Sequence, residues 1–156
     1  EEMVEALISL LLPQTTLLTP NSLEARRLAQ EADESQEDDA QRVLGLAECA
    51  HQLINFGCEY VLVTGTHEDT PQVVNTLYGS HGVVCAHRWD RLPGSYHGSG
   101  CTLASAIAAH LANGHGIMDA VAGAQEYTWQ TLAAGFRPGM GQLIPNRLFW
   151  LHDGDA

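Results

Sequence analysis

The sequence contains no lysine, and all seven of its basic residues are arginines. A Walker-A phosphate-binding loop requires its lysine, so that class of nucleotide-binding protein is excluded. Enzymes that bind a carbonyl substrate through a lysine Schiff base are excluded for the same reason. Any phosphate bound by this chain must therefore be held by backbone amides, by arginine or by a metal ion.

Positive charge is scarce overall. The seven arginines stand against nineteen acidic residues, which gives a formal net charge of −12 at pH 7. This balance argues against nucleic-acid binding and against docking on anionic membranes. No apolar run approaches the length of a transmembrane helix, and no secretory signal opens the sequence. We therefore expect a cytoplasmic protein with neither a nucleic-acid partner nor a membrane partner.

The four cysteines show neither a CxxC pair nor zinc-finger spacing. We interpret them as reduced thiols, in agreement with a cytoplasmic location. The chain has 156 residues, 45% of them hydrophobic, which is enough for one domain with a buried core. We predict a single domain over residues 1–156.

Apolar residues recur with helical spacing in several segments. A helix that follows the acidic segment 31–39 and ends at Gly57 has a predicted apolar face formed by Val43, Ala47, Ala50 and Ile54. The acidic segment itself predicts a solvated loop. Further helices are predicted over residues 3–12, 22–30, 99–113 and 117–134.

Two segments have the pattern of strands, and a third pattern indicates a hairpin. Residues 59–64 form a nearly continuous apolar run, which suits the middle of a parallel sheet covered by helices. Residues 15–19 predict a second, shorter strand, and residues 73–89 predict a hairpin that turns at 79–82. The order of elements indicates an α/β domain. Since the chain begins inside a helix, we expect an N-terminal portion to be absent.

The turn formed by Gly98, Ser99 and Gly100 leads directly into a predicted helix. Glycines let a backbone approach a ligand closely, and the first N–H groups of a helix have no internal partner. Such a turn forms an anion site that suits a transferring phosphoryl group. Cys101 lies in the first helical turn, which favours a thiolate that accepts the proton of an attacking hydroxyl. A purely structural turn with a buried cysteine explains the same pattern equally well.

Asn21 and Glu24 have the spacing of a capping box at the start of a helix. Alternatively, both side chains face the phosphates of a nucleotide and its Mg²⁺, directly or through water. The spacing alone favours the cap, but the two roles are compatible, because ligands of α/β proteins bind at strand ends. Thr64 and Gly65 end the apolar strand, and the same rule makes them candidate ligand neighbours. His110 falls on the helix face of Leu103 and Ile107, which predicts a boundary histidine rather than a metal ligand.

Taken together, these motifs resemble the bacterial hydroxymethylpyrimidine/phosphomethylpyrimidine kinases of the ribokinase superfamily. Residues Leu18–Ala25 resemble the family's TPN-x-x-EA segment, and Tyr60–His67 resemble its VLVKGGH strand. The most specific resemblance is that of His97–Ala109 to HGTGCTLSSAIAA. Residues Asp119–Tyr127 and Phe149–Trp150 are similar to the family's last long helix and its ending.

The resemblance implies a ribokinase-like three-layer αβα sandwich with a mainly parallel central sheet, a hairpin and a missing N-terminal part. It implies ATP- and Mg²⁺-dependent phosphorylation of 4-amino-5-hydroxymethyl-2-methylpyrimidine and of its monophosphate in thiamine biosynthesis. Most of the superfamily has aspartate where Cys101 stands, and cysteine there marks this group and related pyridoxal kinases. The family's small-molecule partner is a pyrimidine alcohol, and its members often form homodimers.

The resemblance also implies roles for individual residues. Cys101 is the catalytic residue, and the backbone of Gly98-Ser99-Gly100 forms the anion hole. Asn21 and Glu24 serve the Mg²⁺ and the ATP phosphates, and Thr64-Gly65 lies beside the nucleotide.

The chain departs from the family in charge and in length. The family's phosphate-binding lysine is Thr64 here, and the second glycine of that motif is Thr66. The loss of a charge-assisted contact costs about 1.5–3 kcal/mol unless an arginine substitutes. The candidates are Arg88, Arg91 and Arg137. The N-terminal segment that carries most of the family's pyrimidine pocket has no counterpart in the sequence.

Three alternatives remain open from the residues. A pyridoxal-type kinase of the same superfamily is the nearest one. A non-catalytic nucleotide-binding fragment is the second, and the missing lysine and N-terminal half motivate it. A cysteine hydrolase that uses Cys101 with His97 is disfavoured, because the two residues are close in sequence and no orienting acid lies nearby.

Overall fold

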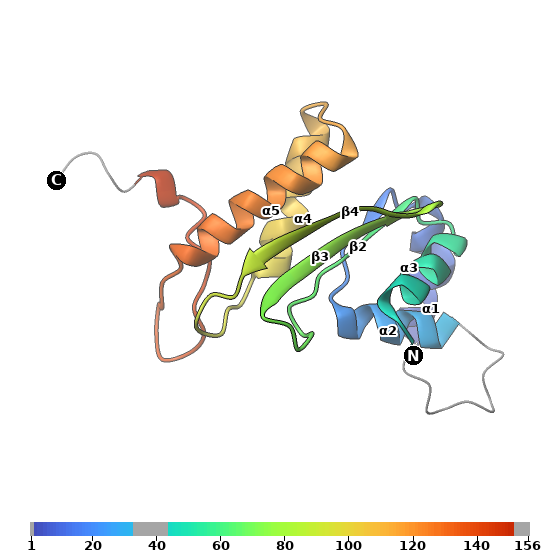
Figure 1. Cartoon of the computed structure of the whole chain (residues 1–156), viewed down its shortest axis with the longest axis horizontal. Helices are drawn as coiled ribbons and strands as arrows, with labels where there is room; N and C mark the ends of the chain where they lie inside the picture. Colours follow the sequence, from blue (N-terminus) through green and yellow to red (C-terminus); the bar gives the residue numbers. More distant parts are fainter. Residues whose placement is uncertain (1, 33–43, 152–156) are drawn as a thin grey trace. The chain divides into compact units, whose positions relative to one another are not determined.

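The computed structural model describes residues 2–32 and 44–151. Its chain divides into two units, Glu1–Asp90 and Arg91–Ala156, and each is described by itself (Figure 1). The single domain expected for residues 1–156 stays a prediction. None of the helices in the described ranges has both the length and the apolar character that crossing a membrane requires.

The first unit contains a sheet of four strands in the order β1-β2-β3-β4. Its strands are β1 (Leu17–Leu18), β2 (Tyr60–Val63), β3 (Gln72–Gly79) and β4 (Gly82–Asp90). The pairing of β1 with β2 is parallel, whereas β2 with β3 and β3 with β4 are antiparallel. The predicted parallel pair and the hairpin are confirmed, and β3 and β4 run side by side as a long ribbon (Figure 1).

The described sheet is mixed, so the expectation of a mainly parallel sheet holds only for β1 and β2. The reason lies in the lengths of the connections. A parallel pair needs a long crossover, which helices supply between β1 and β2. Only a short loop separates β2 from β3, and a tight turn separates β3 from β4, so both of these pairs are antiparallel.

The helices of this unit are α1 (Glu2–Ala6), α2 (Ser22–Ala32) and α3 (Leu46–Asn55). The helix predicted for residues 3–12 begins as α1 and continues as a π-helical turn at Leu7–Leu11. It then ends in a 3-10 turn, Leu12–Gln14, that includes Pro13. Proline is tolerated there because the first residues of a helical turn need no N–H donor.

The core of the first unit is built from α2, α3 and the strands. The apolar face of α3 was predicted one step out of register. Ala50 is buried as expected, but Ala47 is exposed, and Cys49 and Leu53 are buried instead. The stripe follows the i, i+4 spacing of Cys49 and Leu53. Ile54, also predicted on this face, is half-buried against the core. Val43, the fourth predicted residue, lies outside the described residues, as does most of the acidic segment 31–39.

The second unit is a pair of packed helices followed by an irregular segment. Helix α4 spans Ser99–Ala112 and helix α5 spans Ile117–Ala133, which confirms both predicted helices. A Cβ atom on Gly123 of α5 would lie 2.9 Å from Cε1 of His110 on α4. This glycine therefore lets the imidazole ring of α4 pack directly on the backbone of α5. The segment after α5 closes in a short 3-10 turn, Phe149–Leu151.

Candidate functional site

The candidate residues Asn21 and Thr64 lie together at the carboxyl ends of the two parallel strands, β1 and β2. The backbone N–H of Ser22 donates to the carbonyl of Thr64 at 3.1 Å, and the N–H of Thr64 donates to the carbonyl of Pro20 at 2.9 Å. Asn21 and Thr64 thus form a parallel bridge just beyond β1 and β2. This is the position at which α/β proteins hold their ligands.

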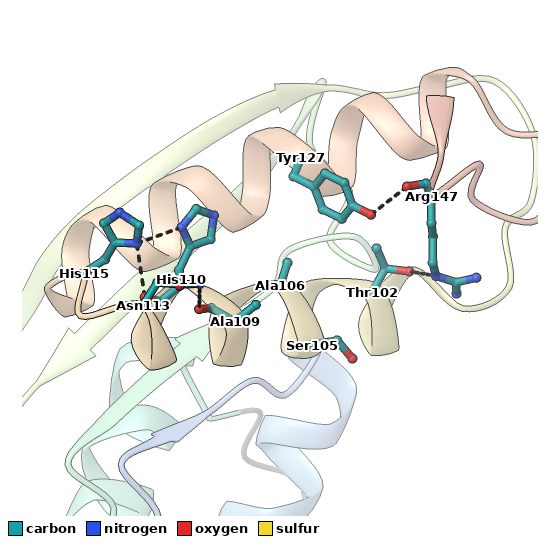
Figure 2. Close-up of a pocket in the computed structure, with 9 residues that line it drawn as sticks. All are labelled: Thr102, Ser105, Ala106, Ala109, His110, Asn113, His115, Tyr127 and Arg147. Atoms are coloured by element: carbon teal, nitrogen blue, oxygen red, sulfur yellow. Dashed lines mark hydrogen bonds between the residues drawn. The ribbon is translucent and has the colours of Figure 1, made fainter. Parts of the chain in front are cut away.

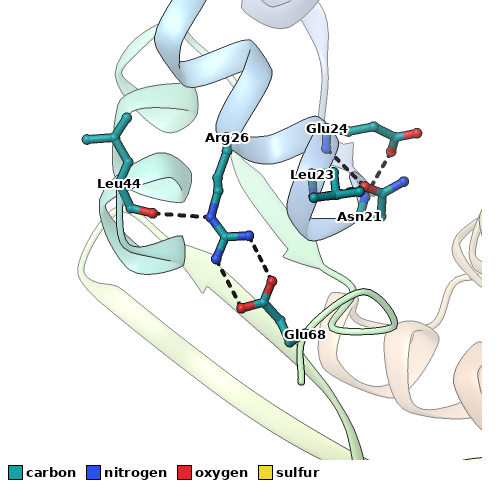
Figure 3. A network of polar contacts seen from close by, with 6 residues as sticks. All are labelled: Asn21, Leu23, Glu24, Arg26, Leu44 and Glu68. Carbon is teal, nitrogen blue, oxygen red and sulfur yellow. Dashed lines mark hydrogen bonds and ion pairs between the residues drawn. The ribbon is translucent and has the colours of Figure 1, made fainter. Parts of the chain in front are cut away.

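Asn21 and Glu24 form the predicted capping box (Figure 3). The amide oxygen of Asn21 accepts the N–H groups of Leu23 at 3.0 Å and of Glu24 at 2.9 Å. Oε2 of Glu24 accepts the N–H of Asn21 at 2.9 Å. The Asn21 oxygen is therefore fully used by the cap. Glu24 is exposed, and its other carboxylate oxygen accepts no hydrogen bond from the part of the chain that the structure describes.

Gly65 is required by a close approach of two backbone segments. A Cβ atom at this position would lie 2.3 Å from the carbonyl oxygen of Val74 on β3. The N–H of Gly65 donates to Oδ1 of Asn75, which is itself buried, at 3.1 Å. This N–H is therefore not free for a phosphate, and Gly65 shapes the loop that follows β2.

An ion pair that the sequence patterns did not reveal fixes the same loop. Arg26 of α2 donates from both terminal nitrogens to the two carboxylate oxygens of Glu68, at 2.8 and 3.0 Å (Figure 3). Nε of Arg26 donates to the carbonyl of Leu44 at 3.3 Å. The guanidinium lowers the pKa of Glu68 to about 2, and the carboxylate raises the pKa of Arg26. Arg26 is thus committed to holding the loop against α2.

In the second unit, the glycine turn opens α4 as expected. Gly98 precedes the helix in the left-handed region with φ 90°. Its carbonyl accepts the N–H of Thr102 at 3.0 Å and the hydroxyl of Thr102 at 2.8 Å. The N–H groups of Ser99, Gly100 and Cys101 have no acceptor among the described residues. They are the unpaired donors of a helix start and suit an anion.

Cys101 is exposed. The purely structural interpretation of this turn required a buried cysteine, so the exposure favours a chemical role. Ser99 is half-buried beside it. The sequence-predicted turn residues are therefore assembled within the second unit, whereas Asn21 and the residues around it are assembled within the first.

Arg147 is a functional candidate that the sequence patterns missed. Its Nε donates to the hydroxyl of Thr102 at 3.0 Å (Figure 2). A Cβ atom on Gly98 would lie 3.2 Å from one of its terminal nitrogens. The guanidinium thus lies against the glycine turn. Arg147 follows a proline-containing irregular segment, and no local periodicity indicated where its side chain would lie.

A cavity of about 510 Å³ lies between α4, α5 and the segment of Arg147 (Figure 2). His110 lines it and its Nδ1 lies 3.2 Å from Nδ1 of His115, so His110 is a hydrogen-bonded boundary residue as predicted. In the described ranges, no group of three or more side chains of the metal-binding types lies close enough together to hold an ion. The cavity is lined by Thr102, Ser105, Ala106, Ala109, His110, Asn113, His115, Tyr127 and Arg147.

Comparison with known protein families gives one match that covers most of the chain. The model of the phosphomethylpyrimidine kinase family matches residues 1–146. The hydroxymethylpyrimidine/phosphomethylpyrimidine kinase of Mycobacterium tuberculosis is 38% identical over 152 residues, which cover 95% of this chain and 52% of that protein. The pyridoxine kinase of Bacillus subtilis is 31% identical over 140 residues, which cover 86% of this chain and 48% of that protein. The chain spans about half the length of the curated relatives it matches.

Solved structures give the same result for the fold. The pyridoxal kinase of Staphylococcus aureus in complex with AMP-PCP and pyridoxal has a TM-score of 0.82 and 25% identity, covering 96% of this chain and 55% of that one. Its complex with ADP has a TM-score of 0.81 and 26% identity, covering 96% of this chain and 53% of that one. The predicted α/β, ribokinase-like fold is confirmed.

Proposed function

Because the chain belongs to the phosphomethylpyrimidine kinase family, we propose that residues 1–156 are the C-terminal, nucleotide-binding and catalytic part of one kinase domain. The kinase transfers the γ-phosphoryl group of ATP to 4-amino-5-hydroxymethyl-2-methylpyrimidine and then to its monophosphate. The observation that carries this proposal is the start of α4, where three unpaired N–H groups adjoin the exposed Cys101. Family membership also supports a cytoplasmic location and a homodimer, and we include both in the proposal.

The glycine turn supplies the electrostatic part of the reaction. The N–H groups of Ser99, Gly100 and Cys101 and the dipole of α4 stabilise the negative charge on the oxygens of the transferring group. The hydroxyl oxygen of the pyrimidine attacks the γ-phosphorus, and the bond from that phosphorus to the β–γ bridging oxygen breaks to release ADP. The proton of the hydroxyl passes to the thiolate of Cys101.

The residues at the start of α2 fit a magnesium ion held through water. Glu24 offers an exposed carboxylate oxygen that the cap does not use. Asn21 has no such capacity at its oxygen, so its role is to hold the helix start and with it Glu24. Mg²⁺ keeps several of its waters in such sites and, when bound, neutralises charge on the ATP phosphates. The backbone groups of Thr64 and Gly65 are already paired within the chain. Their role is therefore to form the wall beside the nucleotide rather than to donate hydrogen bonds to its phosphates.

Two observations bear on the choice of substrate. The family model favours the pyrimidine alcohol. The structures of Staphylococcus aureus pyridoxal kinase with ADP or AMP-PCP support nucleotide binding by this fold, and they favour pyridoxal as the second candidate substrate. A nucleotide-binding protein without catalytic activity remains the alternative from a different class.

The test is a coupled assay of ADP release with the complete protein that contains this chain. Turnover is expected with hydroxymethylpyrimidine and its monophosphate, and Cys101→Ala is expected to lower kcat by about 100-fold or more while ATP affinity is unchanged. Turnover of pyridoxal without turnover of the pyrimidine would assign the second substrate instead. ATP binding without turnover of any of these alcohols would assign the non-catalytic role.

A further inference from the structure

The guanidinium of Arg147 is connected to the glycine turn by hydrogen bonds through the buried hydroxyl group of Thr102. The side chain of Thr102 is almost fully buried, at 3% exposure. Its hydroxyl donates to the carbonyl of Gly98 at 2.8 Å and accepts Nε–H of Arg147 at 3.0 Å. A single oxygen therefore connects the guanidinium to the backbone of the turn.

The guanidinium keeps most of its donors available. Arginine carries five N–H donors, and Arg147 uses the one on Nε. Within residues 2–32 and 44–151, its two terminal nitrogens have neither a hydrogen bond nor an ion pair. The residue is exposed, and one of these nitrogens lies beside Gly98. The free donors are thus placed where the turn presents its own unpaired N–H groups.

The backbone of Arg147 is held in place from α5. The hydroxyl of Tyr127 donates to the carbonyl of Arg147 at 3.0 Å (Figure 2). The N–H of Asn146 donates to the carbonyl of Thr131 at 2.9 Å. The ring of Tyr127 lies 6.2 Å from that of Phe149 and 6.0 Å from that of Trp150. A side chain fixed at both its base and its Nε loses little freedom when it binds an anion.

The arginines of α2 are engaged differently. Arg26 forms an ion pair with Glu68. Nε of Arg27 lies 3.9 Å from Oε1 of Glu31 on the same helix. Of the arginines that the sequence suggested, Arg88 belongs to the first unit, and Arg137 makes neither a hydrogen bond nor an ion pair with the turn among the described residues. Arg147 lies at this turn, as both its hydrogen bond to Thr102 and its position beside Gly98 show.

We propose that Arg147 binds the oxygens of the transferring phosphoryl group at the glycine turn, and that Thr102 is its positioning residue. This inference rests on the proposed kinase function and names a further residue of the same site. The sequence has no lysine to supply this charge. The guanidinium supplies it, and its planar donor geometry matches two phosphoryl oxygens at once.

The kinetic experiment compares variants of the complete kinase. Arg147→Ala and Arg147→Gln are expected to lower kcat/KM by about 10-fold to 100-fold, as loss of a charge-assisted contact does. Arg147→Lys is expected to recover part of the loss, since it keeps the charge without the planar donors. Arg27→Ala is the matched control, because it removes the same charge from an exposed site. Values of kcat/KM for both neutral Arg147 variants within about 2-fold of the control would overturn the inference.

The positioning role of Thr102 has its own readout. Thr102→Ser keeps the hydroxyl and is expected to retain activity, whereas Thr102→Val removes it. Since the guanidinium is then misplaced in the transition state, Thr102→Val is expected to lower kcat by about 10-fold with little change in KM for ATP. Equal kcat values for the serine and valine variants, with both proteins folded by circular dichroism, would overturn this role.

A probe that needs no turnover separates this inference from the kinase proposal. Sodium tripolyphosphate mimics the phosphates of ATP, and the exposed Cys101 reports on the turn through its rate of alkylation by iodoacetamide. Tripolyphosphate is expected to slow alkylation by about 5-fold in the wild type and in Arg27→Ala, and by less than about 2-fold in Arg147→Gln. Equal protection in all three proteins, or protection in none, would overturn the inference whether or not the protein is a kinase.

Discussion

Arg26 and Glu68 meet through two parallel hydrogen bonds of 2.8 and 3.0 Å, which join helix α2 to the loop after β2. The pKa of Glu68 is lowered from 4.5 to about 2 in the folded chain, first because of the hydrogen bond from Arg26. A lowered carboxyl pKa stabilises the fold above the unfolded value and ceases to do so as the pH falls through the folded value. Protonation of Glu68 therefore weakens the attachment of this loop.

We expect Glu68→Gln to lower the free energy of unfolding by about 1 kcal/mol at pH 7, because both partners are partly exposed. The difference from the wild type should shrink as the pH falls from 4.5 and vanish near pH 2. Urea titrations over this pH range measure it. Glu31→Gln, which alters a longer and more exposed pair on α2, is the control. A difference that does not change with pH would show that the ion pair contributes nothing.

Two glycine substitutions should differ strongly in cost. Gly65→Ala would drive a methyl group to 2.3 Å from the backbone oxygen of Val74, which cannot move without disturbing β3. Gly123→Ala would meet the tip of His110 at 2.9 Å, and an imidazole ring can rotate away. We expect losses of unfolding free energy of about 3 kcal/mol for the first and about 1 kcal/mol or less for the second. Thermal unfolding of the two variants measures the difference, and equal losses would contradict this structure of the β2–β3 loop.

Glu24→Gln separates the capping role of this residue from the role toward magnesium that we propose for it. Glutamine at this position keeps the hydrogen bond to the N–H of Asn21, so we expect unfolding free energy to change by less than about 0.5 kcal/mol. The carboxylate charge is lost, so the Mg²⁺ concentration for half-maximal activity should rise by about 10-fold. A titration of activity with MgCl₂ measures the shift. Asn21→Ala is the counterpart, which should cost about 1 kcal/mol of stability through loss of the cap.

The four thiols should differ in reactivity. Cys101 is exposed. Burial raises the pKa of the thiols of Cys49 and Cys58, which are fully buried, and of Cys85, which is partly buried. We expect iodoacetamide at pH 7.5 to label Cys101 at least about 10-fold faster than the buried thiols of the native chain. Peptide mapping by mass spectrometry at successive times measures the order. Faster labelling of Cys49 or Cys58 would mean that the first unit opens readily.

Features that depend on neighbouring residues could be predicted from the sequence. The capping box of Asn21 and Glu24 spans three residues, and the hairpin and the two long helices carry local periodicity. The contacts of Glu68 and of Arg147 could not be predicted in this way. The contact of Glu68 with Arg26 joins residues 42 positions apart, and that of Arg147 with Thr102 joins residues 45 positions apart. Nothing near Glu68 or Arg147 in the sequence indicates its partner. The buried face of α3 was misassigned because several small or apolar residues fit more than one helical stripe.

Gly65 illustrates the same limit. The sequence indicates that Gly65 ends a strand, and this position predicts a residue that lies beside a bound ligand. Its actual constraint comes from the backbone of Val74 and the amide of Asn75, which only the pairing of β2 with β3 brings near. The family resemblance predicts a nucleotide neighbour at this position, and these contacts explain why the residue is glycine.

The hydrogen bond from Arg147 to Thr102 joins residues 45 positions apart, so the anion site that we propose forms only when α4, α5 and the following segment are folded together. The cap of α2, by contrast, closes within three residues and can form in a largely unfolded chain. A triphosphate that binds the turn would therefore bind the folded second unit and not its denatured state. By mass action, such a ligand raises the melting temperature of this unit, and it acts on the folding equilibrium as well as on the reaction.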